Sequence, residues 1–247
     1  MLMSDINIYV IMAIMKRSFS KGSYVHVIKR GVRGLPIVKD THDKWRFMRL
    51  LRYFNDENSH TNWHRQVVAA GAEGRYMPWP KRWQERSALV HIHAFVLMPN
   101  HFHLLLEEID DGGIAKFMKK ISESMTKYYN KKYDQKGSLF QGPYKASEVT
   151  TDEYLKFLFG YILVKNPFEL YPDGFKAAAN NFESAFLWAK NYPFSNLPGF
   201  LTKKNRTEIT EKSAGEEFFS DLSDFKVVAK EAVRYSQAKK LENIILE

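Results

Sequence analysis

The sequence contains no cysteine. Disulfide bonds are therefore excluded, and a metal ion bound by this chain must use nitrogen and oxygen ligands in place of thiolates. The absence is typical of a reducing compartment, and we expect a cytoplasmic protein.

Long hydrophobic runs are also missing. The apolar run at residues 6–15 has ten residues, whereas a membrane-spanning helix needs about 20. No basic segment precedes it and no small-residue cleavage site follows it, so a signal peptide is not predicted. Met15-Lys16-Arg17 resembles a natural start, and we expect residues 1–14 to be an N-terminal extension of doubtful status.

Acidic residues are fewer than basic ones: 28 Asp and Glu stand against 37 Lys and Arg, for a net charge of +9. Such a surplus favours a polyanionic partner, because each phosphate that a Lys or Arg neutralises releases condensed counterions. Charge alone does not identify that partner. The hydrophobic content of 45% is enough to bury a core in one domain of ordinary size.

Hydrophobic periodicity predicts the order strand, helix, two strands, helix, strand, helix. This order is typical of an α+β fold with a ferredoxin-like antiparallel sheet and helices on one face. The predicted elements are strand 23–30, helix 40–54, strands 88–97 and 101–108, helix 114–133, strand 138–149 and a helix from 150 that Asn166-Pro167 ends.

We place the main domain at residues 15–201, with an insertion at 55–87 and a linker with a charged helical tail at 202–247. The insertion carries three tryptophans among basic residues, a composition suited to stacking on unpaired bases beside bound DNA. Aromatic side chains that simply anchor a long loop are an equally good interpretation.

Two histidines, His101 and His103, stand two residues apart on a predicted strand, which puts both imidazoles on one face. Neutral imidazole binds divalent metals, and without thiolates we expect Mg²⁺ or Mn²⁺ completed by oxygen ligands. His91 and His93 have the same spacing, and we interpret them as half-buried hydrogen-bonding residues. His26 on the first strand could donate to a phosphate or orient a ligand, but we expect it to be structural.

Four stretches in order resemble a known family. They are YVHVIKRGV at 24–32, MPNHFHLLLE at 98–107, GSLFQGPYKA at 137–146 and the helix that leads to Asn166-Pro167. Together they resemble the single-tyrosine histidine–hydrophobic–histidine (HUH) transposases of the insertion-sequence-200 type, especially the REP-associated tyrosine transposases. The resemblance implies a ferredoxin-like fold, single-stranded or hairpin DNA as partner, a homodimer, and a tyrosine nucleophile that forms a 5′-phosphotyrosine.

The resemblance also implies that the nucleophilic tyrosine stands four residues before an asparagine that helps to hold the metal. Here Ile162 stands at that position, and Tyr161 is five residues before Asn166. Five residues of a regular helix rotate by about 500°, leaving the two side chains about 140° apart. A π-bulge or an unwound last turn would bring them together. Otherwise the third ligand is not Asn166, or the protein is catalytically impaired.

The predicted site therefore has Tyr161 as catalytic residue and Tyr129 as alternative nucleophile, whereas Tyr128 is expected on the apolar face of its helix. The predicted metal ligands are His101, His103 and Asn166, and the predicted DNA-binding residues are Arg30, Lys145, Gln141 and Lys127.

Three functions remain open. The first is a metal-dependent transposase that cleaves and rejoins single-stranded DNA. The second is a domesticated, inactive relative that binds structured single-stranded DNA. The third is an RNA-binding domain on a ferredoxin-like sheet, which ranks last because the aromatic motif of such sheets is not visible.

Overall fold

The computed structural model describes residues 18–200, 208–210 and 218–245. The expected N-terminal extension at residues 1–14 lies outside the described residues, as does most of the expected linker after residue 202.

The fold is built on one antiparallel sheet of four strands. The strands are β1 (Tyr24–Arg30), β2 (Val90–Leu97), β3 (His101–Glu108) and β4 (Lys145–Glu148), in the spatial order β2-β3-β1-β4. The hairpin β2–β3 and the long-range pairs of β1 with β3 and β4 are all antiparallel. The predicted α+β fold with a ferredoxin-like sheet is confirmed, although β4 is shorter than the predicted strand.

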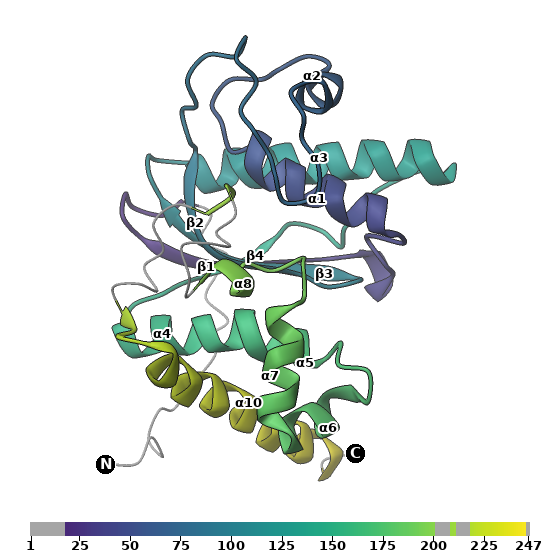
Figure 1. Cartoon of the computed structure of the whole chain (residues 1–247). Coiled ribbons are helices and arrows are strands. Elements are labelled where there is room, and N and C mark those ends of the chain that lie inside the picture. The colour runs from purple at the N-terminus through teal and green to yellow at the C-terminus, as the bar shows by residue number, and fades with distance from the viewer. Residues whose placement is uncertain (1–17, 201–207, 211–217, 246–247) are drawn as a thin grey trace.

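Two helices, α1 (Thr41–Tyr53) and α3 (Gly113–Tyr133), cover one face of the sheet (Figure 1). The Asp40 side chain caps α1 by accepting a hydrogen bond from the Asp43 N–H. The apolar faces of both helices pack on alternate side chains of β3, such as Phe102 and Leu104, which are fully buried. Tyr128 was predicted to lie on the apolar face of α3, and this prediction was wrong. The next residue, Tyr129, lies in the core instead.

The opposite face of the sheet is covered by the C-terminal helices (Figure 1). Leu105 on β3 and Ala94 and Val96 on β2 point to this side and join a second apolar cluster. Helices therefore bury both faces of the sheet, and the prediction of helices on one face was wrong, because the apolar side chains of this second face also need a cover. The helical segments are α4 (Asp152–Gly160), the π-helical turn η2 (Tyr161–Lys165), α5 (Asn166–Phe168), α6 (Gly174–Asn180), α7 (Phe182–Lys190), α8 (Leu197–Phe200) and α10 (Leu222–Ile245).

The helical tail predicted from the sequence corresponds to α10, which packs across α4. The two helices approach closely at Gly160, where an added Cβ would lie 2.9 Å from the Cα of Ala229. The glycine therefore permits a contact between backbones that a larger residue would block. None of the helices in the described part of the chain is both long and apolar enough to cross a membrane.

Residues 55–87 contain the short helix α2 (Trp63–Ala69), which lies beyond α1 and α3 from the sheet (Figure 1). Its aromatic side chains pack on one another: the Trp83 ring stacks on His60 with ring centroids 3.6 Å apart and meets Trp79 edge to face. This packing supports the anchoring interpretation of the insertion, because those rings are already covered.

The last predicted helix does not end at Asn166-Pro167 but continues through α5. A proline inside a helix normally leaves a carbonyl without its hydrogen-bond donor. Here Pro167 directly follows a π turn and stands in the first turn of α5, where its missing N–H is tolerated.

Candidate functional site

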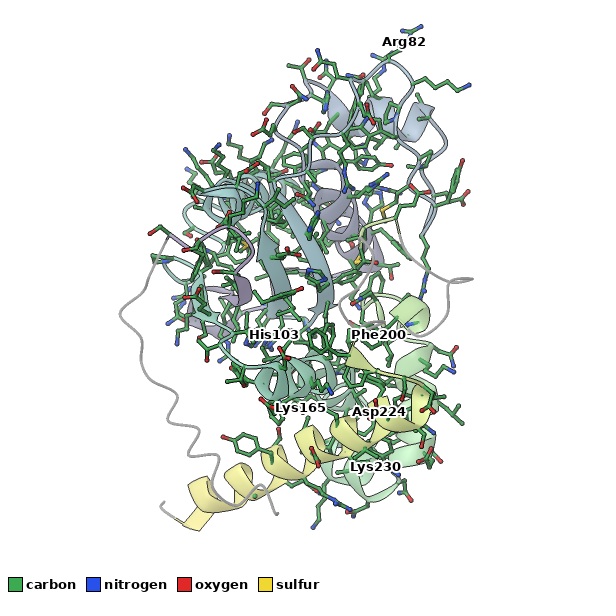
Figure 2. The ribbon with its side chains drawn as sticks, turned by 90° about the vertical axis from the view of Figure 1, so that its left-hand side faces the viewer. Arg82, His103, Lys165, Phe200, Asp224 and Lys230 are labelled. Carbon is green, nitrogen blue, oxygen red and sulfur yellow. The ribbon has the colours of Figure 1, made fainter. Side chains whose placement is uncertain are left out.

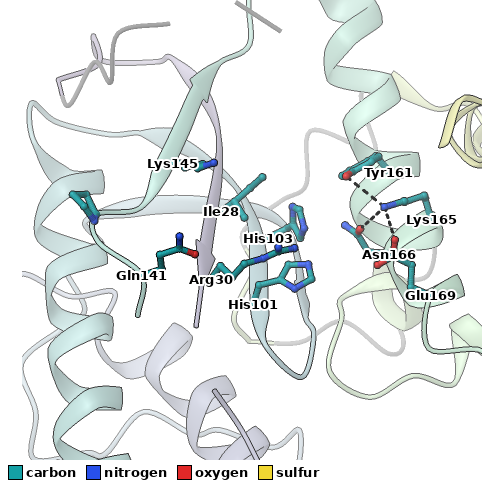
Figure 3. Close-up of a pocket in the computed structure, with 11 residues that line it drawn as sticks. Ile28, Arg30, His101, His103, Gln141, Lys145, Tyr161, Lys165, Asn166 and Glu169 are labelled. Carbon is teal, nitrogen blue, oxygen red and sulfur yellow. Dashed lines mark hydrogen bonds and ion pairs between the residues drawn. The ribbon is translucent and has the colours of Figure 1, made fainter. Parts of the chain in front are cut away.

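A cavity of about 620 Å³ lies between the sheet and the segment η2–α5 (Figure 3). Figure 2 shows His103 on the sheet side and Lys165 on the helical side. The lining residues come from β1, β3, the start of β4 with the segment before it, the π turn, and α5 with the residue after it: Ile28, Arg30, His101, His103, Gln141, Pro143, Lys145, Tyr161, Lys165, Asn166 and Glu169.

His101 and His103 both line this cavity because side chains two apart on a strand share a face. Their ring centroids are 5.0 Å apart and their planes are inclined by 72°. With metal–nitrogen bonds of about 2.1 Å, two imidazoles on one metal have centroids roughly 5 Å apart. The pair therefore has the separation that a shared metal requires.

The hydrogen bonds of Asn100 determine which nitrogen of His101 is free. The Asn100 Nδ2 donates to the carbonyl of Gly34 at 3.0 Å, so its Oδ1 faces His101. Because an amide oxygen only accepts, the proton of His101 lies on Nδ1, which donates to Oδ1 at 2.6 Å. The lone pair of His101 is therefore on Nε2, and a metal ligand oriented by its other ring nitrogen is the usual arrangement.

His103 has an equivalent partner in His26, whose Nε2 lies 2.9 Å from the Nδ1 of His103. His26 stands on β1 opposite Leu105 of β3, and its side chain is buried. The hydrogen bond engages Nδ1 of His103, so its Nε2 remains the nitrogen for an external ligand.

The three rings are in a dry environment that disfavours their charged forms. Burial lowers the pKa of His26 and of His101 to about 4. Burial also lowers the pKa of His103 well below its ordinary value of 6.5, with the nearby His26, His101 and Lys165 acting in the same direction. At neutral pH the imidazoles are therefore uncharged, which is the form that binds metals.

The π turn brings Tyr161 to the histidines. Its ring meets that of His103 edge to face with centroids 5.7 Å apart, and it meets that of His26 at 6.2 Å. The N–H of Asn166 donates to the carbonyl of Tyr161, which is the five-residue hydrogen bond of a π-helix. The π turn contains one residue more than an α-helical turn, and this extra residue offsets the five-residue spacing. Tyr161 and Asn166 therefore line the same cavity.

Lys165 ties this segment together. Its Nζ donates to Glu169 Oε1 at 2.9 Å and makes longer contacts with Asn166 Oδ1 at 3.4 Å and Tyr161 Oη at 3.5 Å (Figure 3). The Nδ2 of Asn166 is buried without a hydrogen-bond partner. An unpaired buried N–H donor is costly, so the Nδ2 of Asn166 is suited to donate to an acceptor oxygen that enters the cavity.

The residues present fit a divalent metal. Two imidazoles offer Nε2 lone pairs, Asn166 offers an amide oxygen that now makes only a long contact of 3.4 Å with Lys165, and the lining residues include no sulfur donor. A set of nitrogen and oxygen donors suits Mn²⁺, and Mg²⁺ where waters supply further oxygens.

The structure brings together most of the predicted site and separates the rest. Arg30, Gln141 and Lys145 line the cavity with the histidines. Lys127 lines a different cavity beside α1, on the other face of the sheet. Tyr129 is packed in the core between α3 and the sheet, so the alternative nucleophile is not placed near His101 and His103.

Sequence reasoning assigned no role in the site to Lys165 or Glu169 and treated His26 as structural. A signal for the first two was present, because Tyr161, Lys165 and Glu169 recur every four residues along one helical face. For His26 the signal was weaker: it shares the strand face of Ile28 and Arg30, but its contact with His103 depends on the pairing of β1 with β3.

One family model agrees with the motifs. Residues 61–164 match the family model described as "Transposase IS200 like", a segment that includes both histidines and Tyr161 and ends before Asn166. No match was found among curated proteins. A solved structure of a REP-associated tyrosine transposase bound to a REP hairpin is similar at 12% identity and a TM-score of 0.41, over 78% of this chain and 87% of that chain. The resemblance predicted from the motifs is thus confirmed by the family model over residues 61–164, where this chain is similar to the IS200-like transposases.

Proposed function

We propose that this protein is a metal-dependent tyrosine transposase that cleaves and rejoins single-stranded DNA. The observation that carries the proposal is the meeting of Tyr161 with His103 in one cavity, which depends on the π turn. Strand cleavage by a side chain needs a nucleophilic oxygen, a cation beside the phosphate and groups that align the strand. The cavity contains residues for all three.

The proposed chemistry is a phosphoryl transfer. The Oη of Tyr161 forms a bond to the phosphorus of the scissile phosphate, and the bond from phosphorus to the 3′ oxygen breaks. The phenol loses its proton, and the departing 3′ oxygen gains one, leaving a 5′-phosphotyrosine and a free 3′ hydroxyl. Reversal with another 3′ hydroxyl rejoins DNA without an external energy source, because the phosphodiester energy is kept in the covalent link.

The metal, Mg²⁺ or Mn²⁺, would be held by His101, His103 and Asn166 and would neutralise charge on the scissile phosphate. Lys165 lies against both Tyr161 and Asn166 and holds them in place before DNA arrives. The side chains of Arg30 and Lys145 face the same cavity and would contact backbone phosphates, while Gln141 offers an amide to a base.

The partner would be hairpin-ended single-stranded DNA, as the family resemblance implies, and the protein would act as a cytoplasmic homodimer. Light scattering of the purified chain tests the dimer. Binding of hairpin and unstructured oligonucleotides at several salt concentrations tests the preference for hairpins.

The test of the chemistry is a covalent adduct. The full chain is incubated with Mn²⁺ and a hairpin oligonucleotide labelled at its 3′ end, and the products are separated under denaturing conditions. We expect a labelled protein band that Tyr161→Phe abolishes and that Tyr129→Phe, the matched control, retains. A band that persists in Tyr161→Phe would assign the nucleophile to another residue.

A second function is favoured by one observation: Lys165 contacts the Oδ1 of Asn166 and the Oη of Tyr161, the atoms that an active enzyme needs. If that contact does not open, the protein binds structured DNA without cutting it. Salt-dependent binding with no adduct under any divalent metal would identify this binding protein.

A further inference from the structure

A second cluster of possible ligands lies on the same face of the sheet, away from the cavity. The Oε2 of Glu107 accepts hydrogen bonds from both His91 Nδ1 at 3.1 Å and His93 Nε2 at 2.9 Å. The three ligand atoms lie within 4.8 Å of one another. Two imidazoles and one carboxylate thus converge on a single point.

A β-bulge produces this convergence. Ile92 pairs with Leu106 and Ala94 pairs with Leu105, so His93 is an extra residue on β2. The buried side chain of Asn196 holds the bulge, because its Nδ2 donates to the His93 carbonyl and its Oδ1 accepts from the Phe95 N–H. Bulges re-aim side chains and are frequent beside functional sites.

The cluster is open to solvent at His91 and closed at His93. The side chain of His93 is 4% exposed, that of Glu107 25% and that of His91 41%. A metal bound here would be anchored by the buried ring and would keep a coordination position for water. Glu107 stands four residues beyond His103 on β3, a separation of about 13 Å at the rise of a strand, so this cluster is distinct from the cavity of Tyr161.

We propose that His91, His93 and Glu107 bind one Zn²⁺ ion. Two imidazoles and a carboxylate with an open fourth position are a donor set that zinc prefers, and its bonds of about 2.0–2.2 Å place ligand atoms roughly 3.3 Å apart. The ligand atoms, now within 4.8 Å of one another, therefore need to approach each other by up to about 1.5 Å. When the ion binds, the proton on His91 Nδ1 and the proton on His93 Nε2 each move to the other nitrogen of the same neutral ring, which frees the lone pair that faces the ion.

The ion ties the edge strand β2 to β3 at the bulge. At this point the pairing of the two strands is interrupted by the extra residue. Zinc bound here raises the melting temperature of the chain, since a ligand that binds only the folded state stabilises it.

The experiment must separate this cluster from the histidines of the cavity. Zn²⁺ binding is measured by calorimetry on a background of His101→Ala with His103→Ala, in the full chain. We expect this double variant to retain one equivalent of Zn²⁺. The addition of His91→Ala, at the most exposed ligand, should weaken the affinity by about 100-fold or more. Co²⁺ should give the visible absorption of a tetrahedral site in the double variant, and this absorption should be lost when His91→Ala is added.

Glu107→Gln on the same background is the second variant, because it keeps the shape of the side chain and weakens a ligand. Circular dichroism of each variant establishes that it is folded. The proposal is overturned if the double variant binds no Zn²⁺, or if affinity and melting temperature with Zn²⁺ are unchanged by His91→Ala and Glu107→Gln. Neither result depends on whether Tyr161 cleaves DNA.

Discussion

The carbonyl of Tyr161 accepts its hydrogen bond from the N–H of Asn166, five residues later, where an α-helix would use the fourth. This one widened turn places the phenol and the amide on the same side of the helix. A regular helix through the same sequence would turn one of them away from the cavity by about 140°. The π turn is therefore the local feature on which the proposed chemistry depends.

We predict that Asn100 determines how tightly His101 binds a metal, because its Oδ1 holds the His101 proton on Nδ1 and leaves the Nε2 lone pair free. Removing the acceptor in Asn100→Ala should weaken Mn²⁺ binding by about 10- to 100-fold, the usual effect of losing a residue that orients a ligand. Asn100→Asp keeps an acceptor oxygen and should bind nearly as well as the native chain. The measurement is the Mn²⁺ concentration that gives half-maximal adduct. Equal values for the Ala and Asp variants would contradict the role of Oδ1.

Lys165→Met is predicted to slow adduct formation by about tenfold or more, because it removes the hydrogen bonds that position Tyr161 and Asn166. The control is Lys176→Met, which removes an exposed charge from α6 outside the cavity. Single-turnover rates of adduct formation check the prediction. A faster reaction in Lys165→Met would instead show that the lysine inhibits the site, because its hydrogen bond engages the Oδ1 of Asn166.

Lys145 and Lys127 are predicted to differ in DNA binding, although both are exposed lysines. Lys145→Ala removes a charge from the cavity of Tyr161 and should lower the salt dependence of single-strand binding by about 0.7 in the logarithmic slope, the value for one lost phosphate contact. Lys127→Ala changes the opposite face of the sheet and should leave the slope unchanged. A loss in both variants would indicate DNA that wraps around the molecule.

Asp43 is predicted to make stability depend on pH. Burial alone would raise the pKa of Asp43, but hydrogen bonds from Lys132, the Lys39 N–H, Tyr133 and Tyr128 outweigh it and hold the pKa well below its ordinary value of 3.8. A carboxylate with a lower pKa in the folded state stabilises the protein above the unfolded pKa and loses that contribution as the pH falls toward the folded pKa.

The measurement for Asp43 is urea unfolding of the native chain and of Asp43→Asn between neutral pH and pH 3. At neutral pH the variant should be less stable by about 2 kcal/mol, the scale of hydrogen bonds to a charged group. The difference between the two proteins should shrink below pH 3.8, when the carboxyl of the unfolded chain becomes protonated. A constant difference would mean that the effect is one of packing and does not depend on charge.

Much of the fold was predictable because periodicity is a local property. The alternation at 24–30 and the helical spacing at 41–53 each depend on neighbouring residues, and both elements formed within a residue or two of the prediction. The pair His101 and His103 was predictable for the same reason, since spacing along a strand decides which face a side chain takes. The π turn was one of the options that the five-residue spacing of Tyr161 and Asn166 left open.

The sequence by itself determined the ferredoxin-like order of elements, the face shared by His101 and His103 and the mismatch at Ile162. Only the tertiary structure decided that Tyr161 meets His103, that His26 supports that ring, and that Tyr129 is buried on the other side of the sheet. The reason is that each of these relations joins elements far apart in the chain. Strand pairing and helix packing bring them together, and no local pattern encodes those contacts.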